Sequence, residues 1–241
     1  MSRENRMDAI KPKTLAVIPG AGTGQRMGAG RAKQFMELKG RPILALTLEK
    51  FQSCDVVESI IPVVPSGDVE FCEREIVEKY GLDKVKKVIA GGRRRQDSVR
   101  HGIEASGGQY EWILIHDGVR PFVDIGLIEK AVLTARVNRA VIAALPVRET
   151  IKEVDGDGLV IQTLARRGLW LVQTPQVFRY EDIMNAHKKA LTEGWDEATD
   201  DAMLLERAGV PVRVITGSEW NIKITTPHDL EIVRYLLGRH E

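Results

Sequence analysis

A glycine-rich segment directly behind a buried strand is the feature that most constrains this chain. The apolar run at residues 15–18 is typical of a buried parallel strand, and residues 19–33 after it contain five glycines. Glycine lets the backbone approach an anion closely, and successive N–H groups in such a loop form a concave positive nest. Arg26 and Lys33 add two cations to the same segment. The combination predicts a polyphosphate-binding site at the carboxyl end of a strand.

Two familiar phosphate loops are excluded by their spacing. A dinucleotide fingerprint needs Gly-x-Gly-x-x-Gly, but the third glycine is replaced by Gln25, Met27 or Lys33 in the three possible registers. A P-loop ends in Gly-Lys-Ser/Thr, and the sequence contains no Gly-Lys pair. Glycine content alone favours an irregular surface loop, whereas the strand before the loop and the two cations favour phosphate binding.

Strand-like and helical patterns alternate along the rest of the chain. Strands are expected at residues 57–64, 85–90, 112–116, 140–145 and 212–216, and helices after Pro42, at 68–80, 97–105, 181–191 and 200–208, and from Pro227. This alternation predicts an α/β fold with a mostly parallel, twisted sheet that is flanked by helices on both faces. Residues 1–241 are expected to form a single domain, with residues 1–13 disordered.

The alternation is interrupted between residues 148 and 171. Strand-like segments at 151–154 and 159–163 flank the turn Asp155-Gly156-Asp157-Gly158, which predicts a protruding β-hairpin arm. A lone two-stranded hairpin is marginally stable in water, so the arm needs a partner surface.

Composition limits the classes of partner. The formal net charge is +1, so no global basic field attracts nucleic acid, and the run Arg93-Arg94-Arg95 is interpreted as a solvated local patch. No apolar segment is long enough to span a bilayer or to act as a signal peptide. Cys54 and Cys72 are the only cysteines, lack Cys-x-x-Cys spacing, and fit reduced thiols better than a disulfide framework. We therefore expect a cytoplasmic protein that binds neither nucleic acid nor membranes.

The sequence also resembles a known family. From about Leu15 to Leu237 it is similar to the cytidylyltransferases that act on 2-C-methyl-D-erythritol 4-phosphate, which are nucleotidyltransferases with a Rossmann-like, glycosyltransferase-A-like sheet. The matching segments are Pro19 to Met27, Lys33-Gln34-Phe35, Gly91 to Val99, His116 to Pro121, Pro146 to Thr150, Arg166 to Trp170, Gln173 to Gln176, Thr199 to Asp201 and Asn221 to Thr225. A lone glycine loop is weak support, whereas this ordered set is specific.

The resemblance implies transfer of CMP from CTP to the polyol phosphate, with release of pyrophosphate, in the non-mevalonate pathway to isoprenoid precursors. It implies a homodimer with shared active sites, whose arms at residues 148–171 embrace the second subunit. Mg²⁺ is implied because this ion bridges phosphate oxygens. The substrate phosphate is already an anionic nucleophile, so positioning and electrostatic stabilisation should carry the catalysis.

Site residues follow from the same motifs, position by position. The catalytic candidates are Arg26, Lys33, Arg166 and Lys223. The nucleotide-binding candidates are Pro19, Gly20, Ala21, Gly22, Thr23, Gly24, Gly92, Ser98 and Asp117, of which Gly92 and Ser98 read the cytosine ring. The polyol phosphate is assigned to Asp117, Arg120, Arg166, Thr199 and Lys223.

Some assignments have bland alternatives. Asp117 is the carboxylate expected to approach the metal or the ribose, but an Asp after a strand is also common as a turn residue or helix N-cap. Ser98 fits ordinary capping at a helix start equally well. Arg26 and Lys33 could be exposed surface charges.

Departures from the family pattern leave the substrate open. Arg167 and Trp220 stand where Asn and an acidic or small residue are usual, and both lie near the expected substrate pocket. Trp220 and Trp195 are expected in the core. A cytidylyltransferase that uses ribitol 5-phosphate shares the nucleotide half of the site and is the first alternative. A nucleotide-binding protein without turnover is the second.

Overall fold

The computed structural model describes residues 13–22, 32–196 and 198–238. The disorder expected for residues 1–13 therefore concerns residues outside the described ranges, except for Lys13. The Lys13 carbonyl accepts hydrogen bonds from the N–H groups of Glu111 and Trp112. These bonds tie Lys13, which directly precedes the first strand, to the start of the strand that begins at Trp112.

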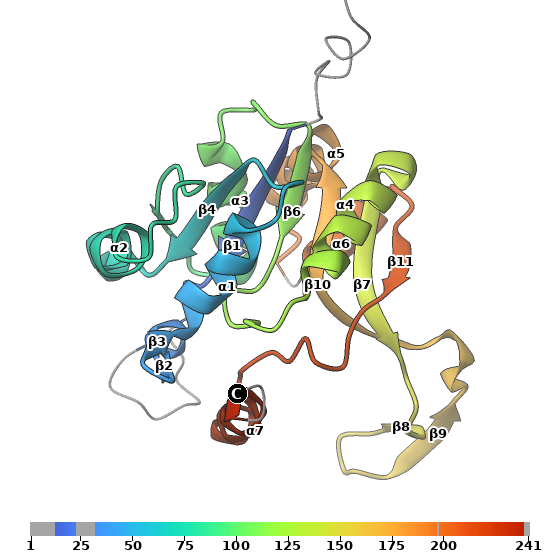
Figure 1. Ribbon diagram of the computed structural model, residues 1–241. Coiled ribbons are helices and arrows are strands. Elements are labelled where there is room, and N and C mark those ends of the chain that lie inside the picture. Colours follow the sequence, from blue (N-terminus) through green and yellow to red (C-terminus); the bar gives the residue numbers. More distant parts are fainter. Residues whose placement is uncertain (1–12, 23–31, 197, 239–241) are drawn as a thin grey trace, which may run out of the picture.

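A seven-stranded sheet runs through the described part of the chain, in the order β11-β7-β10-β6-β1-β4-β5 (Figure 1). The strands are β1 (Thr14–Pro19), β4 (Ser59–Val64), β5 (Ile89–Ala90), β6 (Trp112–Ile115), β7 (Ala140–Pro146), β10 (Trp170–Arg179) and β11 (Arg213–Thr216). Strand β10 is antiparallel to both of its neighbours, and the other neighbouring pairs are parallel. The prediction of a mostly parallel sheet is confirmed.

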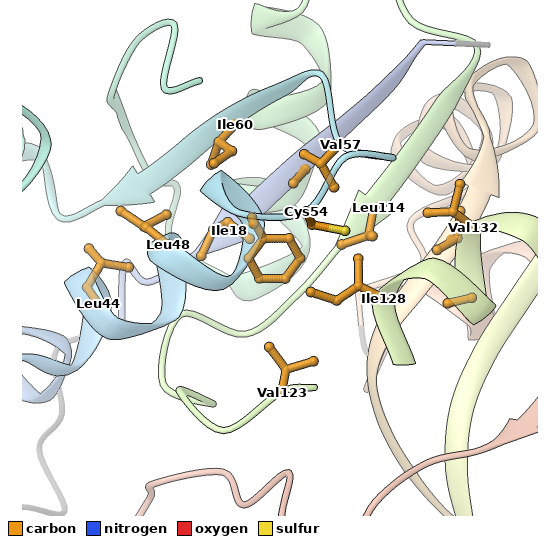
Figure 2. Packing of buried hydrophobic residues seen from close by; sticks show 14 of the residues in the cluster. Ile18, Leu44, Leu48, Cys54, Val57, Ile60, Leu114, Val123, Ile128 and Val132 are labelled. Carbon is orange, nitrogen blue, oxygen red and sulfur yellow. The ribbon is translucent and has the colours of Figure 1, made fainter. Parts of the chain in front are cut away.

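Helices cover both faces of the sheet because residues along each central strand alternate between two cores. Ala16 and Ile18 of β1 pack with α1 (Ile43–Gln52) and α4 (Ile125–Asn138) on one face, which Figure 2 shows around Leu44, Leu48 and Ile128. Leu15 and Val17 pack on the opposite face with α3 (Arg95–Ala105), α5 (Tyr180–Glu193) and α6 (Asp201–Arg207). This alternation sets which side chains of β1 face each core and so specifies the register of the strand in the sheet.

Several elements differ from the sequence-based expectation. The helix expected at 68–80 consists of η4 (Ser66–Asp68), α2 (Val69–Cys72) and the π-helix η5 (Glu73–Glu78). The strand expected at 85–90 shrinks to β5 and an isolated bridge between Val85 and Ile60. Helix α4 and strand β10 were not predicted. A short turn of η3 (Lys33–Phe35) leads into the small hairpin of β2 (Glu37–Leu38) and β3 (Arg41–Pro42).

The expected arm is present as a hairpin of β8 (Ile151–Val154) and β9 (Val160–Leu164), followed by η6 (Arg166–Gly168). It projects away from the sheet in Figure 1. Leu159, Val160 and Ile161 are 68%, 59% and 59% exposed, so the described part of the chain leaves most of the surface of these apolar side chains uncovered. Such a surface is typical of a segment that packs on another molecule.

The last helix, α7 (Pro227–Gly238), lies apart from the main sheet in Figure 1. Leu230 and Val233 pack with Leu38, Val119 and Ile224 in a separate small cluster. This cluster joins the C-terminal part of the chain to the loop that follows β6. Among the described residues, no helix has the length and apolarity needed to cross a membrane. Cys54 and Cys72 are buried free thiols, as expected.

Candidate active site

Two cavities lie beyond the carboxyl ends of the parallel strands, where open α/β sheets bind their ligands. The first, the glycine-loop cavity, is lined by residues that follow β1 and β5, including Pro19 to Gly22 and Gly92. The second, the β10 cavity, lies against residues 172–176 and the start of α6. Arg95, Asp117 and Lys223 line both cavities, so one set of charges separates two adjacent binding spaces.

The glycine-loop cavity brings together most of the residues predicted to bind the nucleotide. Its lining includes Pro19, Gly20, Ala21, Gly22, Lys33, Gly92, Ser98 and Asp117. The predictions for Thr23, Gly24 and Arg26 lie outside the described residues. Lys33 is half-buried and stands at the first position of η3. A cation and a glycine-rich backbone therefore face the same space, as the sequence suggested.

Close packing holds the backbone of this cavity in place. The Gly20 N–H donates to the Val63 carbonyl at 2.7 Å, which anchors the loop to the end of β4. A Cβ atom on Gly91 would stand 2.2 Å from the Ala21 Cβ, and a Cβ on Gly92 would stand 2.4 Å from the Asp97 Cβ. Both glycines are thus required by close approach of neighbouring chain segments.

Ser98 does not cap α3, which was the alternative to base recognition, because Asp97 Oδ2 accepts the N–H of the N-cap residue Arg94. The Ser98 Oγ accepts a hydrogen bond from the Gly92 N–H at 3.1 Å and donates to the Arg94 carbonyl, four residues earlier, at 3.1 Å. Ser98 is buried, so its hydroxyl fixes the Gly92 backbone beside the cavity. Its contact with a cytosine ring stays a prediction.

The β10 cavity gathers four of the five residues predicted to hold the polyol phosphate, namely Asp117, Arg120, Thr199 and Lys223. Arg166 is not among the described residues that line either cavity. It is exposed on the arm, and its Nη1 donates to the Arg148 carbonyl at the base of the arm. Within one subunit Arg166 therefore stands apart from Lys33 and Lys223.

Asp117 is the electrostatic centre of the site. Its Oδ2 lies 3.1 Å from Arg120 Nε and 3.0 Å from Lys223 Nζ, and its Oδ1 lies 3.5 Å from Arg95 Nε. Burial raises the pKa of this carboxyl, but the three cations outweigh burial and hold the pKa far below its ordinary value. Asp117 is therefore ionised at any pH at which the protein works.

Arg95 is the functional candidate that sequence reasoning missed. It was grouped with Arg93 and Arg94 as a solvated basic run, yet its Nη1 donates to Asp201 Oδ2 at 2.6 Å. Asp201 and Asp117 raise the pKa of the Arg95 guanidinium against the opposing effect of burial. A charge run carries no mark that separates Arg95, which pairs with Asp117 and Asp201, from Arg93 and Arg94. The match of Arg95 to the family motif was the available signal.

The prediction for Trp220 is wrong. The sequence suggested a core position, whereas the side chain is 63% exposed, in the turn that precedes buried Asn221. The turn is closed by hydrogen bonds of Ser218 and Trp220, which direct the neighbouring Asn221 inward and leave the indole in solvent. Trp195 is half-buried against the α5–α6 face, as expected for a packing residue.

Comparison with known proteins decides which family this geometry belongs to. The sequence profile of the 2-C-methyl-D-erythritol 4-phosphate cytidylyltransferase family matches residues 14–239. The chain belongs to this family.

Relatives and solved structures agree over almost the whole length. The cytidylyltransferase of Geobacter metallireducens is 47% identical over 90% of this chain and 94% of its own, and that of Syntrophus aciditrophicus is 43% identical over 96% and 99%. The crystal structure of 4-diphosphocytidyl-2C-methyl-D-erythritol synthase from Anaerococcus prevotii superposes with a TM-score of 0.83 at 34% identity, covering 95% of this chain and 97% of that one. The α/β fold and the family resemblance are both confirmed.

In this member of the cytidylyltransferase family, the two cavities form two halves that share a wall of charged side chains. One glycine-lined space lies beside Lys33, and the other lies beside Arg120 and Thr199. The side chains of Arg95, Asp117 and Lys223 stand where the two halves meet. This arrangement can hold two anionic ligands next to one another.

Proposed function

We propose that the chain transfers the cytidylyl group of CTP to 2-C-methyl-D-erythritol 4-phosphate, giving 4-diphosphocytidyl-2-C-methyl-D-erythritol and pyrophosphate in the non-mevalonate isoprenoid pathway. The family and the names of its relatives support this activity. The observation that carries it is the junction of the two cavities at Asp117 and Lys223. A CTP-dependent enzyme needs such adjacent spaces for its nucleotide and its acceptor.

The reaction requires stabilisation of negative charge on the phosphates rather than a general base. An oxygen of the polyol phosphate attacks the α-phosphorus of CTP in line, the new P–O bond forms, and the bond to the β-phosphate oxygen breaks to release pyrophosphate. The attacking oxygen is already ionised, so no residue has to remove a proton. The site has to bring two anions together and stabilise the charge that develops on the phosphoryl oxygens.

The nucleotide is assigned to the glycine-loop cavity. The backbone of residues 19–22 and the Lys33 ammonium face this space and are suited to a triphosphate. Arg26 is proposed as the second cation from the sequence motif. The cytosine ring is assigned to the close-packed backbone at Gly92, which Ser98 holds in place.

The polyol phosphate is assigned to the β10 cavity. Arg120 Nε donates a hydrogen bond to Asp117 Oδ2, and Nη1 donates one to the Asn221 carbonyl. Nη2 is the guanidinium nitrogen that we assign to the ligand. The Lys223 side chain is 37% exposed and its Nζ pairs with Asp117 Oδ2, so its remaining protons can reach a phosphate. Thr199, exposed before α6, offers a hydroxyl to the polyol.

The residues present fit a divalent metal that is held mainly through substrate phosphates. Among the described residues, no group of three or more His, Cys, Asp or Glu side chains could hold a metal ion. Mg²⁺ commonly takes one or two protein carboxylates and otherwise phosphate and water oxygens, and Asp117 can supply one. When bound, the ion would neutralise charge on the triphosphate. We propose Mg²⁺ as this metal.

Dimerisation through the arm is proposed from its exposed apolar surface. Leu159, Val160 and Ile161 need cover, and Arg166 at the end of the arm has no place in the cavities of its own subunit. A two-fold partner would give the arm its packing surface and would receive Arg166 beside its own Lys223. A cytoplasmic location is proposed from the two free buried thiols.

Neither alternative receives support. Relatives that cover nearly the whole chain carry the name of the methylerythritol phosphate enzyme, and no observation favours ribitol 5-phosphate or a protein without turnover.

Nucleotide selectivity tests the proposed function. The purified chain, Mg²⁺ and 2-C-methyl-D-erythritol 4-phosphate are incubated with CTP, UTP or ATP, and pyrophosphate release is followed. We expect a clear preference for CTP, because a rigid backbone at Gly92 presents fixed donors and acceptors to the base. Equal efficiency with all three nucleotides would show that the site does not recognise the cytosine ring.

A further inference from the structure

Asp117 and three other buried residues close a ring of hydrogen bonds. The Asp117 N–H donates to Thr174 Oγ1 at 3.1 Å, and the Asn221 Nδ2 donates to the Thr174 carbonyl at 2.6 Å. Arg120 Nη1 donates to the Asn221 carbonyl at 2.6 Å, and Arg120 Nε returns to Asp117 Oδ2 at 3.1 Å. The members are between 0% and 8% exposed, so solvent does not compete for these bonds. We call Asp117, Arg120, Thr174 and Asn221 the Asp117 ring.

His116 bridges two members of the Asp117 ring, Arg120 and Thr174. Its Nε2 lies 3.2 Å from the Arg120 carbonyl, and its Nδ1 lies 3.0 Å from Thr174 Oγ1. A carbonyl can only accept, so Nε2 carries the proton and Nδ1 accepts from the Thr174 hydroxyl. That hydroxyl is thereby directed away from Asp117 and keeps a lone pair for the Asp117 N–H. The imidazole is fully buried and packs on the Phe51 ring with centroids 5.1 Å apart.

The ring joins three segments that are distant in sequence. Asp117 and Arg120 follow β6, Thr174 lies where the pairing of β10 with β7 is interrupted, and Asn221 precedes α7. Asp117, Arg120 and Thr174 line the β10 cavity, whereas His116 and Asn221 do not. Lys223, which does line it, stands two residues after Asn221. His116 and Asn221 can therefore affect a ligand there only through their neighbours.

We infer that His116 and Asn221 are positioning residues, which hold Arg120 and the loop carrying Lys223 in the geometry that the acceptor phosphate requires. The inference rests on the proposed function, because it names what supports the acceptor half of that site. Mispositioning of a reacting group by about 1 Å can cost about 100-fold in rate. The nucleotide half should respond less, because no hydrogen bond of the ring goes to residues 19–22 or Ser98, and Asp117 alone among the ring residues also lines that cavity.

The first test dissects the two bonds of His116. His116→Phe keeps the stacking on Phe51 and removes both bonds, His116→Asn keeps an acceptor near the Nδ1 position, and His116→Gln keeps a donor near Nε2. We expect kcat/KM for 2-C-methyl-D-erythritol 4-phosphate to fall about 10–100-fold in His116→Phe, with partial recovery in Asn or Gln. KM for CTP should stay within about threefold of wild type. Ser106→Ala, which removes a buried hydrogen bond at the far end of α3, is the matched control.

Asn221→Ala provides an independent second variant. It removes the bond to the Thr174 carbonyl and loosens the loop that carries Lys223, so the same selective loss is expected for the acceptor. Thermal midpoints are measured for every variant. Unchanged kinetics in His116→Phe and Asn221→Ala would overturn the inference. Equal losses for CTP and acceptor that track the fall in thermal midpoint would also overturn it, since that pattern marks a purely structural role.

A spectroscopic measurement needs no catalysis. Long-range ¹H–¹⁵N correlations of the imidazole at pH 7.5 should show the Nε2–H tautomer for His116, assigned by its absence in His116→Phe. An Nδ1–H tautomer would overturn the inference whatever the activity. A wild type without pyrophosphate release would contradict the proposed function instead, so the two failures are distinguishable.

Discussion

Lys223 Nζ lies 3.0 Å from Asp117 Oδ2, so a cation that precedes α7 is held on a carboxylate at the end of β6. The same oxygen also receives Arg120 Nε. Under the proposed function, a phosphate that enters the β10 cavity would compete with Asp117 for Lys223, and a divalent metal would compete with Lys223 for Asp117. Without ligands, the ion pair holds the Lys223 ammonium and the Asp117 carboxylate in place.

Lys33→Ala should lower kcat by about 100–1,000-fold without unfolding the protein, because it removes a cation from the glycine-loop cavity rather than core packing. Steady-state kinetics and circular dichroism measure the two effects. Lys188→Ala, on the exposed side of α5, is the control. An unchanged kcat in a folded variant would exclude Lys33 from charge stabilisation.

Gly91→Ala should weaken CTP binding, because the new methyl group would stand 2.2 Å from the Ala21 Cβ and force residues 20–22 out of place. Gly67→Ala is the matched control, since its Cβ would meet no atom within 4 Å. CTP affinity is measured by calorimetry for both variants. If Gly91→Ala binds CTP as tightly as Gly67→Ala, close packing of the glycine loop does not control nucleotide binding.

Most of the fold was predictable because β1, β4, β6 and β7 are continuous apolar runs bounded by turn residues. Strand β10 escaped prediction since Gln173-Thr174-Pro175 breaks its pattern, and its pairing with β7 is interrupted there. Helix α4 has a weakly segregated apolar face, with Leu133 and Val137 exposed, so its period is hard to see. Contacts with the rest of the fold, rather than the local sequence pattern, determine that α4 and β10 form.

The site was predictable where a motif places residues at a strand end, as with Gly20, Gly92 and Asp117. Arg95 and the Asp117 ring were not predictable, because ion pairs and hydrogen bonds between distant segments leave no periodic signal. Asn221 and Thr174 are 47 residues apart, and only the fold brings them together.

The free energy of unfolding should fall as pH decreases from 6.5 toward 4. Burial lowers the pKa of His116 to about 4, partly offset by its bond to the Arg120 carbonyl, whereas an unfolded histidine titrates near about 6.5. In this window the unfolded chain binds more protons, so acid favours unfolding. From pH 7.5 to 5.0, wild type should lose about 2 kcal/mol more than His116→Phe in urea titrations. Identical pH dependence of the unfolding free energy in both proteins would exclude His116 as a source of the loss of stability in acid.

Subunit exchange tests whether Arg166 acts across a dimer. Arg166→Ala and Lys33→Ala should each be nearly inactive, and mixing them should restore activity, because one site of the heterodimer contains both wild-type residues. Exchange between two tagged Lys33→Ala preparations is the control and should restore nothing. If heterodimers form and remain inactive, the shared-site architecture must be abandoned.

The most direct measurement of the central claim is ³¹P NMR of the purified chain with CTP, Mg²⁺ and 2-C-methyl-D-erythritol 4-phosphate, with ribitol 5-phosphate in a parallel sample. The account predicts that the CTP and phosphomonoester signals are replaced by those of a diphosphate diester and pyrophosphate, far faster with the methylerythritol substrate. No diester, or equal rates with both polyol phosphates, would contradict it.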